Sequence, residues 1–256
     1  MNTVVDDIGY GRQFDGFYHR LFPAGDEVTV EVDQLAALHP DPTSGTFELG
    51  VGNGRIAIPL SRKVGPITGV DSSPEMLALL MDDLAPDTPV TPVHADIREY
   101  TSRRTAGLVY CVCATLSMLL DADDQRRAVR RAADLLAPGG RLVVETHNAS
   151  AVVDLHEGRR RTSYFVPYPE PGTGLQTYST LTPGSSLWHM SHIWYEADGT
   201  TRVGTEVSRL TTPDELDAYA RAAGLVPEHR FGDWSVPLPP HDAQAPLTIS
   251  TYVKGD

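Results

Sequence analysis

The sequence has only two cysteines and no long apolar run, and each shortage excludes a class of protein. Cys111 and Cys113 are separated by one residue. On a strand their side chains therefore share a face, and they cannot build a disulfide framework. No apolar run approaches the roughly 20 residues that span a bilayer, and the N-terminus lacks the basic region and apolar core of a secretory signal. We expect a cytoplasmic protein that does not enter a membrane.

Positive charge is also scarce. Lysine and arginine number 21 against 34 aspartate and glutamate residues, which gives a formal net charge of −13. Such a surface repels a phosphate backbone, so nucleic acid is not an expected partner. The nine histidines are scattered without metal-ligand spacing, and no metal site is expected. A chain of 256 residues suits one α/β domain with an elaboration, or two small domains.

The chain does carry a glycine-rich turn at 48–55, which reads ELGVGNGR. Thr46–Leu49 predicts a short buried strand before it, and the apolar pattern resuming at Ile56 indicates a helix. Glycines at such a turn permit positive φ and let a ligand approach the main chain closely. A dinucleotide fingerprint would need a third glycine where Arg55 stands. The pattern is instead E-x-G-x-G-x-G, with Glu48 placed to face a cationic amine; a purely structural turn is the alternative.

Acidic residues end the next two predicted strands. Strand 66–71 closes on Asp71, whose carboxylate is placed to accept hydrogen bonds from two ribose hydroxyls. Strand 90–93 leads to Asp96 and Ile97, an acid and an apolar residue that suit the edge and face of an adenine ring. The alternatives are a helix-capping role for Asp71, beside the Ser72-Ser73-Pro74 helix start, and a surface turn for Asp96.

A further pair of predicted strands brings a histidine to the same sheet edge. The apolar run 107–112 predicts a strand buried on both faces. The amphipathic helix 122–137 stops at Pro138-Gly139-Gly140, and strand 141–146 ends before His147. Open α/β sheets bind ligands at the carboxyl ends of their strands. His147 is therefore the first candidate for a substrate-facing catalytic group, and a histidine that satisfies a loop carbonyl is the alternative.

Taken in order, the glycine turn, Asp71, the Asp96-Ile97 pair and the string LLAPGGRLVV at 135–144 resemble class I S-adenosylmethionine-dependent methyltransferases over about residues 46–147. The resemblance implies an α/β fold with a Rossmann-like doubly wound sheet, mostly parallel with a reversed last strand, and S-adenosyl-L-methionine as cofactor. It implies cofactor contacts from Tyr10, Arg12, Glu48, Gly50, Gly52, Asp71, Ser72, Met76, Asp96, Ile97 and Cys113.

The chain departs from the family after the fourth strand. Relatives that act on amines often have asparagine and histidine there, whereas this chain has Ala114 and Met118. The usual candidate base is therefore missing. An inserted antiparallel hairpin is predicted by Asp198-Gly199 between the β-rich runs 187–196 and 201–210. On the first run His192 shares a face with three large apolar residues, either as core or as the wall of a substrate pocket, and it is the second catalytic candidate.

We expect four segments: an N-terminal helical lid and first helix at 1–45, a cofactor-binding core at 46–149, an inserted β-rich region covering the substrate at 150–210, and a helix with antiparallel strands at 211–256. The expected reaction is in-line methyl transfer to a nitrogen or oxygen of a small molecule or short peptide, in bacterial secondary metabolism. A non-catalytic binding module and a nicotinamide-dependent oxidoreductase are the alternatives. The oligomeric state is not predicted.

Overall fold

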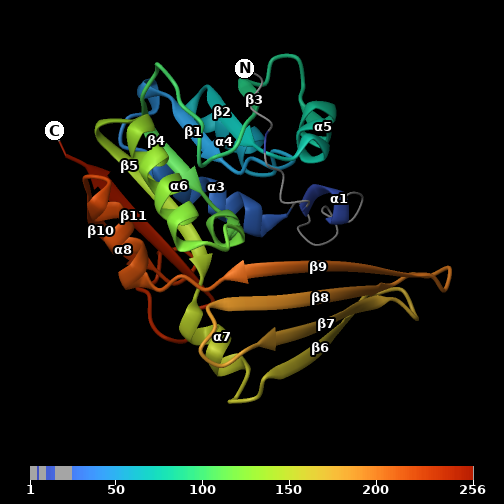
Figure 1. Cartoon of the computed structure of the whole chain (residues 1–256). Coiled ribbons are helices and arrows are strands. Elements are labelled where there is room, and N and C mark those ends of the chain that lie inside the picture. The colour runs from blue at the N-terminus through green and yellow to red at the C-terminus, as the bar shows by residue number, and fades with distance from the viewer. Residues whose placement is uncertain (1–4, 6–9, 15–24, 256) are drawn as a thin grey trace.

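A seven-stranded sheet forms the centre of the fold (Figure 1). The computed structural model describes residues 5, 10–14 and 25–255. The strand order is β10-β11-β5-β4-β1-β2-β3. The strands are β1 (Thr46–Leu49), β2 (Ile67–Asp71), β3 (Val90–His94), β4 (Ala106–Cys111), β5 (Leu136–His147), β10 (Leu225–Phe231) and β11 (Leu247–Lys254). All neighbours pair in parallel except β11, which runs antiparallel to β5 and β10. The predicted fold class, with its reversed last strand, is confirmed.

Helices cover both faces of this sheet. They are α3 (Asp26–Leu38), α4 (Ala57–Val64), α5 (Pro74–Asp83), α6 (Ala122–Leu135) and α8 (Pro213–Ala222). One apolar cluster joins α6 and α8 to the sheet, and a second joins α3, α4 and α5 to its other face. All six residues of β4 are buried, as expected for a strand covered on both sides. No helix in the described part of the chain has the length and apolarity needed to cross a bilayer.

Helix starts follow the local signals in the sequence. Ser73 caps α5, because its hydroxyl accepts a hydrogen bond from the backbone N–H of Met76, and Pro74 occupies the first turn. Thr212 and Glu215 form a reciprocal capping box at α8. These caps fix the helices that flank the carboxyl ends of the strands.

A second sheet projects from that end of the core (Figure 1). It is fully antiparallel, in the order β6 (Arg161–Pro167), β7 (Gly174–Leu181), β8 (Leu187–Tyr195) and β9 (Thr201–Arg209). The short helices α1 (Tyr10–Phe14) and α7 (Ala149–Leu155) pack on it. Trp194 is fully buried, with its ring centroid 6.1 Å from that of Phe14. The aromatic face of β8 is thus mainly core.

A buried ionic cluster lies where α3, the glycine turn and β5 meet. Arg55 Nη1 lies 3.4 Å from Glu31 Oε2, and Arg55 Nη2 donates to Cys113 Sγ. Glu145 accepts a hydrogen bond of 2.7 Å from Trp234 Nε1. Burial, and after it the charge of Glu145, raises the pKa of Glu31 to about 8, against the lowering effect of Arg55. Glu31 therefore holds a proton in the folded protein at neutral pH.

This proton gives a prediction for stability. The usual pKa of Glu31 is 4.5 and its folded value is about 8, so the folded state binds more protons than the unfolded chain between these values. The contribution to stability is present at acid pH and is lost as pH rises toward 8. Glutamine at this position cannot release a proton. We therefore expect the melting temperature of Glu31→Gln to fall less than that of the parent between pH 6 and pH 9.

The matched control is Glu27→Gln, on the same helix but exposed, which should follow the parent across the pH range. Thermal unfolding followed by circular dichroism measures all three proteins. Parallel curves for Glu31→Gln and the parent would contradict the assignment of a proton to Glu31.

Candidate active site

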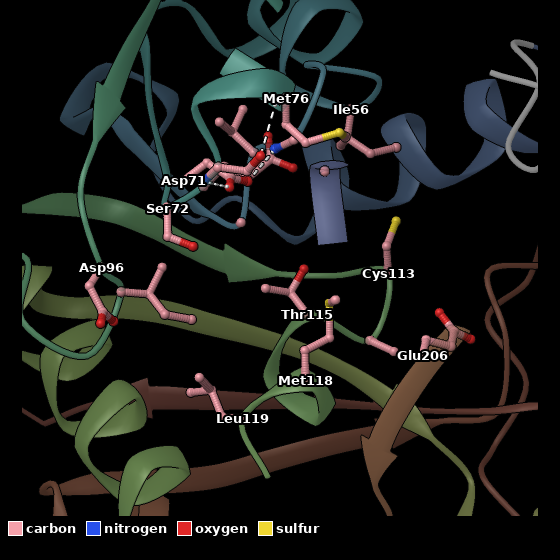
Figure 2. Close-up of a pocket in the computed structure, with 18 of the residues that line it drawn as sticks. Ile56, Asp71, Ser72, Met76, Asp96, Cys113, Thr115, Met118, Leu119 and Glu206 are labelled. Atoms are coloured by element: carbon pink, nitrogen blue, oxygen red, sulfur yellow. Dashed lines mark hydrogen bonds between the residues drawn. The ribbon is translucent and has the colours of Figure 1, made fainter. Parts of the chain in front are cut away.

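A cavity of about 160 Å³ opens at the carboxyl ends of the parallel strands, where β9 of the second sheet closes one side (Figure 2). Most of the candidate residues line it. Those brought together are Glu48, Gly50, Gly52, Asp71, Ser72, Met76, Asp96, Ile97, Cys113 and His147. The topology explains this convergence, because parallel strands end at one edge of their sheet.

Asp71 connects the glycine turn to the start of α5. Its Oδ2 accepts a hydrogen bond of 2.7 Å from the Gly52 N–H, and its Oδ1 accepts one of 2.9 Å from the Ser73 N–H. Gly50 has φ of 85°, and a Cβ there would collide with the Thr115 side chain. Only glycine suits that position, for backbone and packing reasons together. The capping alternative for Asp71 is part of its role, and the carboxylate still faces the cavity.

Glu48 lies at the base of the cavity and is only 2 % exposed. Its Oε2 accepts a hydrogen bond of 2.7 Å from the Tyr110 hydroxyl. Burial raises the pKa of Glu48 well above its usual range, despite the lowering effect of that hydrogen bond. A cation bound beside Glu48 would favour the charged form of its carboxyl group.

Asp96 carries a partner that the sequence reasoning did not consider. Arg98 Nε lies 3.0 and 2.9 Å from the two carboxylate oxygens of Asp96, and Arg98 Nη1 lies 2.6 Å from Asp124 Oδ2. Arg98 lines the cavity beside the buried Ile97. Any amine that approaches Asp96 shares that carboxylate with the guanidinium. The spacing of two residues was the available signal, since an arginine so close in sequence can fold back onto the acid.

The opposite end of the cavity contains a different set of groups. In Figure 2, Cys113, Met118 and Glu206 lie on the side away from Asp71 and Ser72. Cys113 follows β4 with φ of 53° and Ala114 has φ of 54°, and the buried Glu145 carboxyl group lies close to the backbone amides of both. The buried cluster thereby holds this left-handed turn, which forms the cavity wall.

His147 lies at this end as well. Its Nε2 is 3.3 Å from Ser208 Oγ, and its ring meets that of Trp188 edge-on with centroids 5.0 Å apart. Burial lowers the pKa of His147, while the charge of Glu206 partly raises it again. A histidine held neutral in this way can accept a proton at neutral pH.

Three candidates are placed differently. His192 is not a lining residue: its Nδ1 is 3.0 Å from Thr177 Oγ1, and its Nε2 lies 3.5 Å from Glu206 Oε1. Arg12 is exposed and does not line the cavity, although Gly11 of the same short helix does. The side chain of Tyr10 lies outside the described residues. The roles of all three stay predictions.

The sequence reasoning missed Glu206 and Ser208 of β9, which both line the cavity. A signal for them was present. In the hairpin register Glu206 pairs with Met190 and Ser208 pairs with Trp188, and directly paired residues share a face of a sheet. Two polar residues on the face of a buried aromatic run point to a site rather than a core.

The donor set suits S-adenosylmethionine. Acids at one end match hydroxyl and amine donors, Ile97 and Met76 offer apolar surface to a ring, and the glycine turn allows a close backbone approach. The residues that would hold this cofactor are therefore those of the glycine turn, the ends of β2 and β3, and the Cys113 turn.

Comparison with known proteins agrees with this assignment. Residues 47–140 match the methyltransferase domain family. Carboxy-S-adenosyl-L-methionine synthase of Aliivibrio fischeri is 27 % identical over 183 residues, which cover 63 % of this chain and 74 % of that protein. A dTDP-4-amino-2,3,4,6-tetradeoxy-D-glucose N,N-dimethyltransferase of Saccharopolyspora spinosa is 27 % identical over 116 residues, 45 % of each protein.

Among solved structures, the CcbJ methyltransferase of Streptomyces caelestis superposes with a TM-score of 0.86 at 28 % identity, covering 98 % of this chain and 100 % of that one. The predictions of an enzyme and of its cofactor are confirmed. With the glycine turn, the acids at the strand ends and the two-sheet architecture, the chain belongs to the class I S-adenosylmethionine-dependent methyltransferases.

Proposed function

We propose that this enzyme methylates a nitrogen or oxygen of a small molecule or short peptide in bacterial secondary metabolism. The observation that carries the proposal is the position of His147, a half-buried histidine with a lowered pKa at the end of the cavity opposite Asp71. The dimethyltransferase relative, whose name describes an amino sugar, supports a small acceptor.

When bound, the cofactor supplies a methyl group on a positively charged sulfur. The acceptor would form the new bond to this carbon through its lone pair, and the sulfur would keep the electron pair of the carbon–sulfur bond. The protein contributes mainly by holding the acceptor in line, which accounts for roughly 7–11 kcal/mol in favourable cases. Cys113, Thr115 and Met118 form the wall at this end of the cavity. His147 accepts the proton from an acceptor that arrives protonated.

The similarity to carboxy-S-adenosyl-L-methionine synthase raises a second candidate, in which the cofactor itself is modified. Mass spectrometry of the products separates the two. Methyl transfer yields S-adenosylhomocysteine and a methylated acceptor, whereas the alternative yields carboxylated S-adenosylmethionine. Incubation of the enzyme and cofactor with panels of amines, alcohols and phenols, and in parallel with a panel of organic acids as carboxyl donors, provides the test. Carboxylated cofactor as the only product would replace our proposal.

One prediction of the proposed function concerns cofactor binding. We expect Asp71→Ala to weaken S-adenosylhomocysteine binding about 10- to 100-fold, because a hydrogen bond to a charged group contributes roughly 1.5–3 kcal/mol. Isothermal titration measures the change. Asp87→Ala, in an exposed turn, is the control and should bind like the parent. Equal affinities for both variants would remove Asp71 from the cofactor site.

Another prediction of the proposed function concerns proton transfer. For an acceptor found in the screen, we expect His147→Gln to lower kcat about 10²- to 10⁴-fold, the usual contribution of a general base, with S-adenosylhomocysteine affinity preserved. His189→Gln changes an exposed histidine of β8 and should leave kcat unaltered. Unchanged kcat in His147→Gln at saturating acceptor would show that this histidine does not act as the base.

A further inference from the structure

The carboxyl groups that line the cavity differ in the partners that they already contact within the protein. Asp71 binds two backbone amides, Asp96 binds Arg98, and Glu48 is buried against the Tyr110 hydroxyl. Glu206 has a looser environment: its one partner at ion-pair distance among the described residues is His192 Nε2, at 3.5 Å. Its side chain is 22 % exposed, so a small ligand in the cavity can reach it.

Glu206 also stands at the acceptor end. It lies on β9, shares that strand's inner face with Ser208, and its charge reaches the His147 ring. Figure 2 shows it beyond Met118, on the side of the cavity away from Asp71. The groups at this end are therefore a carboxylate, a neutral imidazole and a hydroxyl, with Met118 and Ala114 as apolar surface. No arginine or lysine among the described lining residues belongs to the second sheet.

We propose that Glu206 is the specificity residue of the acceptor site, where its carboxylate binds the ammonium group of an aliphatic amine substrate. This inference rests on the proposed function and narrows it to nitrogen. A carboxylate and a cation form a short charge-assisted hydrogen bond in a partly dehydrated site, and the net charge of −13 favours the approach of cations.

The same arrangement explains why two histidines lie near one acid. His192, anchored through Thr177, stands behind Glu206 on the neighbouring strand and orients its carboxylate, which makes His192 a positioning residue. His147 faces the cavity and takes the proton: the N–H bond of the ammonium breaks, its electron pair stays on nitrogen, and the proton moves to the imidazole. The freed lone pair is then the nucleophile.

The test compares matched probes on the enzyme saturated with S-adenosylhomocysteine. The pairs are cyclohexylamine with cyclohexanol, piperidine with tetrahydropyran, and glucosamine with glucose. Ligand-observed NMR titration gives the dissociation constants. We expect the parent to bind the amine of at least one pair roughly tenfold or more tightly than its neutral partner, the effect of one charge-assisted hydrogen bond.

Glu206→Gln keeps the shape and removes the charge, so we expect the amine preference to fall to near one while the neutral probe binds as before. Asp154→Asn removes an exposed charge from α7 and should preserve the preference. S-adenosylhomocysteine affinity reports folding, since Glu206 lies at the other end of the cavity. A purely structural role for Glu206 would not change the ratio between paired probes.

An amine preference retained in Glu206→Gln overturns the inference, and so does a parent that prefers no amine in any pair. Either result leaves the proposed function standing as long as S-adenosylhomocysteine binds and methylated products form. Failure of the parent to bind S-adenosylhomocysteine would instead count against the proposed function itself.

Discussion

The burial of Arg55 among carboxyl groups is the interaction on which the rest of the structure depends. A buried charge is costly unless it is paired or hydrogen-bonded. Here the guanidinium donates to the protonated Glu31 of α3 and to Cys113, and it lies beside Glu145 of β5. This constraint explains why arginine stands where a dinucleotide fingerprint would have glycine. Arg55 thereby connects the glycine turn to α3 through Glu31 and to the turn after β4 through Cys113.

The left-handed turn after β4 depends on the same cluster. Cys113 and Ala114 adopt positive φ, which costs energy for residues other than glycine. The buried Glu145 carboxyl group lies close to both of their backbone amides and favours this conformation. The turn then directs Thr115 against Gly50. The wall of the cavity and the glycine turn therefore fit each other, and a change in the core beneath them alters the site.

Much of the fold could be predicted because its signals are local. The cap at Ser73, the Asp-Gly hairpin and the apolar run of β4 each depend on neighbours in sequence. The strands β6 and β7 were not individually predicted, because β6 is mostly exposed and β7 lacks a strict alternation of buried and exposed residues. The site likewise has a predictable part and an unpredictable part. Residues at strand ends could be placed from topology, whereas Glu206 approaches His147 only through the packing of two sheets.

That packing carries a functional consequence. The turn after β4, where amine-methylating relatives often carry polar residues, here presents Ala114 and Met118 to the cavity. On our proposal the polar groups come instead from the end of β5 and from β9. The Rossmann-like sheet then holds the cofactor, and the second sheet supplies the charge that selects the acceptor. Because the two tasks lie on different sheets, sequence change along β9 can alter acceptor preference without disturbing the hydrogen bonds of Asp71.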